Sequence, residues 1–217
     1  MQILISGDSW GCGEWGYVDG NYQILHKGLE QYLIEDGHTV TNVSRGRSSN
    51  SESIRRLIDN LTDETDLIIW FQSDPLRDNP VNNLKSYEDI KNINYKNLQI
   101  SYEVLNSIGK KIYCIGGCGR LNNTLISQYS NLIPLIKSVP TFLYKDFIHP
   151  EIWISDFVWN DLYHTLNNEV LENLLKSKQI VDSLHDGTYQ DYFQPDGRHP
   201  NRAGHYKIYE YVKTYCI

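Results

Sequence analysis

Residues Met1 to Gly11 read M-Q-I-L-I-S-G-D-S-W-G, and the fold prediction starts from this stretch. Ile3 to Ile5 form a short apolar run that ends directly in serine, glycine and aspartate, a pattern typical of a buried strand. In open α/β sheets, ligands bind at the carboxyl ends of the strands. The stretch therefore predicts that the hydroxyl of Ser9 lies at the ligand-binding edge of a sheet.

A second motif lies near the other end of the chain, where residues 196–201 read D-G-R-H-P-N. Asp196 stands three residues ahead of His199, and a proline and an asparagine then lead into a final helical pattern. Serine, histidine and aspartate are the groups that a nucleophilic triad needs. We therefore predict Ser9 as nucleophile, His199 as general base and Asp196 as the carboxylate that orients the imidazole.

With these two motifs the chain resembles the SGNH (GDSL-type) hydrolases, which carry Gly-Asp-Ser near the N-terminus and Asp-x-x-His near the C-terminus. The resemblance spans the chain, because the motifs bracket it, and it implies a single domain over residues 1–217. It also implies ester hydrolysis that needs no cofactor. A lone glycine-rich stretch at residues 10–16 does not match the spacing of a dinucleotide-binding motif.

The order of the predicted elements indicates the fold class. Strands are expected at residues 3–5, 38–43, 66–72, 111–115 and 139–144, and helices at 25–33, 51–61, 86–108, 167–184 and from 201 onward. Strands that alternate with helices form parallel sheets covered on both faces. We therefore expect an α/β protein, a three-layer α/β/α sandwich that is flavodoxin-like, with about five parallel strands.

The oxyanion hole is the part of the site where the chain departs from the family. The resemblance implies backbone donors at Ser9 and at Gly46, which follows the second expected strand. The family has Gly-x-Asn-Asp after the third strand, whereas this chain has F-Q-S-D at residues 71–74. Either the Ser73 hydroxyl or the Gln72 amide could replace the asparagine. Neighbouring strand residues point to opposite faces, so only one is expected to serve, and register favours Ser73.

A second Asp-x-x-His-Pro sequence occurs at residues 146–150, so spacing alone does not select the triad histidine. Its Asp146 and His149 flank Phe147 and Ile148, which suggests a packed turn. The pair at 196 and 199 lies in a polar loop that leads into the terminal helix, and a rigid element positions an imidazole well. Context therefore favours Asp196 and His199.

Composition excludes some functions. The net charge is −7 and arginines are interleaved with polar residues rather than clustered, which argues against nucleic-acid binding. No apolar run is long enough to span a membrane, and no leader pattern precedes the first strand, so a cytoplasmic or virion-associated location is expected. The four cysteines lack zinc-ligand spacing and are expected as free thiols, and no metal is expected. The oligomeric state is not encoded in a readable way.

The substrate class follows less directly. The chain lacks a long apolar lid, which favours a small acyl group, and its loops carry tryptophan and tyrosine that could stack on sugar rings. We expect an acetyl ester of a carbohydrate or a similar polar substrate. The aromatic segment 145–164 could wall the pocket or pack beneath a loop. A non-catalytic carbohydrate-binding module with the same fold and an O-acetyltransferase with the same triad are the alternatives.

Overall fold

The computed structural model describes residues 1–78, 86–153, 159, 163, 166, 168–185, 189–194 and 199–217. Its main sheet is parallel, in the order β4-β1-β5-β6-β7: Thr39–Asn42, Gln2–Ser6, Leu67–Gln72, Ile112–Gly116 and Leu132–Ile136. Within this sheet the second strand in the chain lies outside the first and the later strands follow on the other side, which is the flavodoxin-like order. The predicted five-stranded parallel sheet is confirmed.

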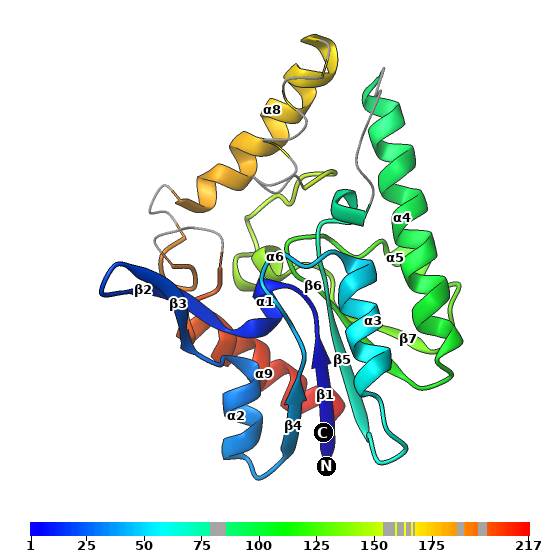
Figure 1. Cartoon of the computed structure of the whole chain (residues 1–217). Helices are drawn as coiled ribbons and strands as arrows, with labels where there is room; N and C mark the ends of the chain where they lie inside the picture. Colours follow the sequence, from blue (N-terminus) through cyan, green and yellow to red (C-terminus); the bar gives the residue numbers. More distant parts are fainter. Residues whose placement is uncertain are drawn as a thin grey trace.

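Helices cover both faces of this sheet (Figure 1). The core on one face joins the sheet to α2 (Leu29–Glu35), α6 (Val139–Leu143) and α9 (Arg202–Cys216). The core on the other face joins it to α3 (Asn50–Asn60), α4 (Tyr87–Ser107) and α5 (Asn123–Ile126). Helix α8 (Asn168–Asp182) packs with the start of α4 in a smaller cluster. These layers confirm the three-layer α/β/α sandwich.

Side-chain alternation along β1 explains the two cores. Ile3 and Ile5 face the layer that contains α2 and α9, whereas Leu4 faces α3 and α4. All six residues of β5 are buried, as expected for a parallel strand covered on both faces. No helix in the described part of the chain is long and apolar enough to cross a membrane.

Two predicted segments differ from the structure. The stretch expected as a loop and the start of a helix forms the short helix α1 (Ser9–Cys12) and an antiparallel hairpin, β2 (Glu14–Val18) and β3 (Asn21–His26). The strand expected at residues 139–144 is helix α6, capped by Ser138, and the fifth strand is β7 instead. Pro134 argues against a strand at this place in the sequence, because proline cannot donate a backbone hydrogen bond. It is tolerated in β7 because β7 is an edge strand.

The aromatic segment 145–164 is described only in part. In its described portion, Phe147 and Trp153 are buried in the core beside α9, and the Trp153 ring meets that of Trp10 edge to face at 6.0 Å. Trp10 and Trp153 therefore pack together in this core. Residues 154–158, 160–162 and 164 of this segment lie outside the described residues.

Candidate active site

Ser9 and His199 meet although they lie at opposite ends of the chain. Ser9 is the first residue of α1, which begins directly beyond β1. The turn is fixed by Asp8, whose carboxylate accepts a hydrogen bond from the Trp10 N–H at 3.0 Å. The Nε2 atom of His199 lies 2.9 Å from the Ser9 hydroxyl oxygen. The predicted nucleophile and the predicted base are therefore within hydrogen-bonding distance.

The backbone around His199 is held on both sides. The His199 carbonyl accepts from the Gln194 N–H at 2.9 Å, and the Asn201 N–H donates to the Tyr192 carbonyl at 2.8 Å. Asn201 also caps α9 through its side chain, which accepts from the Gly204 N–H at 3.0 Å. Asp196 falls within residues 195–198, outside the described residues, so its triad role stays a prediction.

The hairpin brings two aromatic side chains to the pair. The Tyr22 hydroxyl lies 2.9 Å from Nδ1 of His199, and the Trp15 indole donates to the Ser9 carbonyl at 2.9 Å. The sequence analysis missed both. Asp19 and Gly20 could have indicated the hairpin, because an Asp-Gly pair between alternating apolar residues is typical of a hairpin turn. Both residues have positive φ angles, 50° and 80° respectively.

Ser73 lies in a buried network beneath Ser9. Its hydroxyl is 3.0 Å from the Asp8 carboxylate and 2.9 Å from the Ser48 carbonyl, and it accepts from Arg77 at 2.9 Å. The Cys118 thiol lies 3.2 Å from the same Asp8 oxygen, and burial and that charge raise the pKa of Cys118. A hydroxyl has one proton, so in this structure that of Ser73 is already shared between Asp8 and Ser48.

Gln72 is also bonded away from Ser9. Its amide donates to the Arg120 carbonyl at 2.9 Å and accepts from the Tyr102 hydroxyl at 2.6 Å. The side chains of Gln72 and Ser73 therefore have different partners on opposite faces of the sheet, as strand alternation predicts. The prediction that one of them donates to an oxyanion stays a prediction. Asn50, which the sequence analysis did not single out, accepts from the Ser73 N–H at 2.7 Å and so fixes this strand end.

Gly46 lies in the exposed turn after β4, with the Trp15 ring 3.5 Å from the position that a Cβ would occupy. Cys12, the last residue of α1, is buried. Burial and the charge of Asp8 raise the pKa of Cys12 to about 12, so the thiol stays protonated at neutral pH. Trp15 thus links Gly46 to Ser9, whose carbonyl it also contacts.

The alternative pair does not meet Ser9. The ring nitrogens of His149 lie 2.9 Å from the Pro150 carbonyl and 3.2 Å from the Cys118 carbonyl. Burial lowers the pKa of His149 to about 4, so it is neutral at neutral pH, and Asp146 is exposed. His149 is therefore a structural histidine that fixes the loop after β6.

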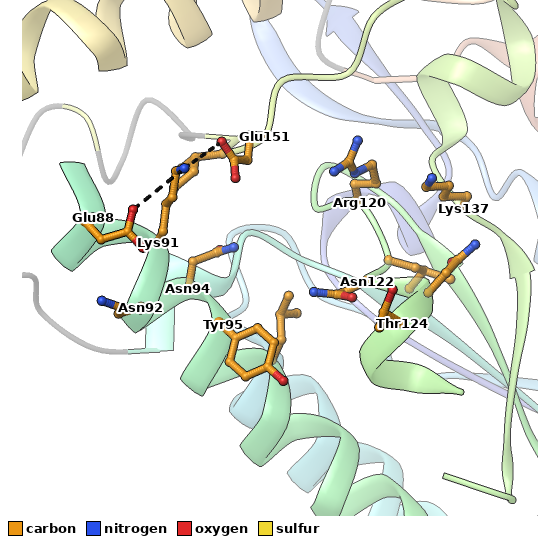
Figure 2. A pocket seen from close by; sticks show the side chains of 14 residues that line it. Glu88, Lys91, Asn92, Asn94, Tyr95, Arg120, Asn122, Thr124, Lys137 and Glu151 are labelled. Atoms are coloured by element: carbon orange, nitrogen blue, oxygen red, sulfur yellow. Dashed lines mark ion pairs between the residues drawn. The ribbon is translucent and has the colours of Figure 1, made fainter. Parts of the chain in front are cut away.

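A separate cavity of about 380 Å³ lies between α4 and the loops that follow β6 and β7 (Figure 2). Its lining includes Asn94, Arg120 and Lys137, and Lys91 bridges toward Glu151 at 3.3 Å. Ser9 and His199 do not line it. In the described ranges, no group of three or more histidine, cysteine, aspartate or glutamate side chains is arranged to bind a metal.

Comparisons with known proteins give structural similarity only. No family model matches the chain, and no curated protein does. Among solved structures, the chain is similar to TesA, with 17% identity, 99% and 97% of the two chains covered and a TM-score of 0.44. It is also similar to the esterase EstA from Pseudoalteromonas sp., with 14% identity, 99% and 97% of the two chains covered and a TM-score of 0.44. A third similar structure is that of a member of the lipolytic G-D-S-L family from Veillonella parvula, with 15% identity, 99% and 97% of the two chains covered and a TM-score of 0.44.

Proposed function

We propose that this chain is a serine ester hydrolase of the SGNH (GDSL) type, formed by one domain over residues 1–217. The observation that carries the proposal is the 2.9 Å contact between Nε2 of His199 and the hydroxyl of Ser9. The two residues come from the two motifs that define the resemblance. Lone serine–histidine contacts occur elsewhere in proteins, but here the serine stands at the carboxyl edge of a parallel sheet, where ligands bind.

The reaction follows the chemistry of a nucleophilic serine. Nε2 of His199 takes the Ser9 proton as the oxygen attacks the ester carbonyl, and the imidazolium then gives that proton to the leaving alcohol. His199 then deprotonates a water molecule, which attacks the acyl–serine, and the imidazolium returns the proton to the Ser9 oxygen as the carboxylic acid leaves. In this proposal Asp196 stabilises the imidazolium through Nδ1. The products are a carboxylic acid and an alcohol, and no cofactor takes part.

The backbone N–H groups of Ser9 and Gly46 are the proposed oxyanion donors. A developing oxyanion would bind these N–H groups more strongly than a neutral carbonyl oxygen does, because charged acceptors form stronger hydrogen bonds than neutral ones. A third donor from Ser73 would require its hydroxyl to turn from Asp8 and Ser48.

The proposed substrate is a small acyl ester, an acetylated carbohydrate or a similar polar molecule. Support comes from the hairpin beside the site, where the Tyr17 ring is 72% exposed and lies 5.0 Å from that of Tyr22. Exposed aromatic rings next to a reactive centre offer flat surfaces on which a ring-shaped substrate can stack. Hydrolysis rates of p-nitrophenyl esters from C2 to C12 test the acyl preference, which should be highest at C2.

One observation favours a second candidate, a non-catalytic binding module with the same fold. Ser73 and Gln72, which occupy the place of the family's asparagine, are both hydrogen-bonded elsewhere. A module of this kind would bind acetylated sugars but would not consume them.

An O-acetyltransferase would consume the ester and pass the acyl group to a sugar acceptor, so product analysis with and without acceptor separates it from a hydrolase.

Labelling with a fluorophosphonate probe tests the proposal, since the probe reacts with activated serines. Wild-type protein should be labelled and should hydrolyse p-nitrophenyl acetate. Ser9→Ala should lose labelling, and it and His199→Ala should each lower kcat by roughly 10⁴-fold or more. Ser51→Ala, an exposed serine on α3, is the matched control and should behave as wild type. Equal labelling of wild type and Ser9→Ala in folded protein would refute the nucleophile assignment.

A further inference from the structure

The β2–β3 hairpin follows α1 along the chain and lies outside the main sheet (Figure 1). Trp15 pairs with Ile24 and Tyr17 with Tyr22 across the two strands, so these four side chains share one face. The His199 ring lies against this face, 5.9 Å from the Trp15 ring and 6.2 Å from the Tyr22 ring, centroid to centroid. Nothing in the triad prediction accounts for this contact.

The Tyr22 hydroxyl is the polar group of this face that meets the histidine, 2.9 Å from Nδ1. A histidine that accepts the Ser9 proton must have an unprotonated Nε2, and a neutral imidazole carries a single N–H. The proton is then on Nδ1, where it faces the phenol oxygen. We propose that Tyr22 is a positioning residue whose oxygen accepts the Nδ1–H of His199 and holds the imidazole in the reactive tautomer; this rests on the proposed function.

Tyr22 is itself held in place on two sides. Its ring stacks on that of Trp15, with centroids 5.5 Å apart and planes inclined by 20°, and Trp15 donates to the Ser9 carbonyl. The base of the hairpin is tied to the chain on either side of His199, because Glu14 accepts from Gln194 at 2.7 Å and from Arg202 at 3.2 Å. The phenol therefore has a fixed position relative to both Ser9 and the imidazole.

The contact gains strength as the reaction proceeds. When His199 takes the serine proton it becomes a cation, and a hydrogen bond from a charged donor is about twice as strong as a neutral one. Tyr22 and the proposed Asp196 carboxylate act on the same nitrogen. Removing either should therefore cost less once the other is gone, and a double-mutant cycle of Tyr22→Phe and Asp196→Asn should show this non-additivity.

Kinetics of Tyr22→Phe test the proposal, since phenylalanine keeps the stacked ring and removes only the oxygen. With p-nitrophenyl acetate we expect kcat to fall roughly 10- to 100-fold, with KM changed far less. The acid limb of the pH–kcat/KM profile should move to lower pH, because the imidazolium loses a partner. Tyr206→Phe, an exposed tyrosine on α9, is the control and should match wild type in both. Unchanged kcat and pH profile in Tyr22→Phe would overturn the role.

Nitrogen NMR of the imidazole tests the same role without any substrate. Wild-type His199 should be protonated on Nδ1 when neutral. A proton on Nε2, with the Tyr22 hydroxyl donating to Nδ1, would refute the proposal even in an active enzyme. If the expected tautomer appears but the wild type neither hydrolyses esters nor reacts with the probe, the contact stands and the proposed function fails.

Discussion

Replacing Arg77 with methionine removes the cation that faces the buried carboxylate of Asp8. Asp8 is fully buried, the Arg77 side chain is 11% exposed, and their nearest atoms are 3.4 Å apart. Arg77 also donates to the Ser73 hydroxyl at 2.9 Å and to the Ser48 carbonyl at 3.2 Å. Every neighbour of the carboxylate described above is a donor, including the Trp10 N–H, which fits an ionised group. The variant leaves this charge without its counter-ion.

The expected loss of unfolding free energy follows from that isolation. Breaking one side of a buried ion pair costs about 3–5 kcal/mol, a large share of the 5–15 kcal/mol that typically stabilises a protein. With a urea m-value of about 2–3 kcal/mol/M, the unfolding midpoint should fall by about 1–2.5 M. Urea titration followed by circular dichroism measures this shift.

Two further variants make that experiment decisive. Lys207→Met removes a surface pair with Glu210, 3.0 Å long, in which both side chains are about half exposed, and should shift the midpoint little. Adding Asp8→Asn to Arg77→Met removes the charge, so the double variant should recover part of the loss, since the amide oxygen can still cap Trp10. A loss below about 1 kcal/mol for Arg77→Met, in a protein that unfolds in one step, would refute the reasoning.

The remaining predictions concern stability. Gly7→Ala places a Cβ 2.6 Å from that of Phe71, so it should cost about 1–3 kcal/mol in urea titrations, and a neutral result would contradict the close approach. Burial lowers the pKa values of His149 and His205 to about 4. The unfolded chain binds these protons near pH 6.5, so stability should be complete above that pH and fall toward pH 4 by roughly 3 kcal/mol for each histidine, less in variants that lack them. Ser49→Ala removes the cap of α3 and should lower the melting temperature, at a cost of about 1 kcal/mol.

The sheet was predictable from the sequence because its strands are short apolar runs with clear ends. Residues 67–72 show this best, since all six are buried in a strand covered on both faces. The segment 132–136 was not predictable in the same way, because a proline normally argues against a strand and only its edge position makes Pro134 acceptable. Residues 139–144 were predicted as a strand although they contain Pro140, whereas residues 139–143 form α6, in which that proline lies in the first turn, where it is tolerated.

Only the site residues that belong to recognisable sequence motifs could be predicted. Ser9 and His199 could be paired because each belongs to a short pattern with a chemical meaning. Tyr22 could not, since its contact with His199 depends on how a hairpin folds over the end of the sheet, although Asp19 and Gly20 mark the turn itself. The contacts of Ser73 with Asp8 and Ser48 depend on where the end of β5 lies relative to the neighbouring loops. No local sequence pattern specifies that position.

The position of β1 inside the sheet has a consequence for how such a protein could adapt. Its backbone is paired to β4 on one side and to β5 on the other, so Ser9, which follows directly beyond it, is anchored to one of the least adjustable parts of the molecule. The hairpin, by contrast, forms a small sheet of its own beside that point. If Ser9 is the proposed nucleophile, new substrate preferences should therefore arise by substitutions in residues 14–26 while the sheet stays as it is.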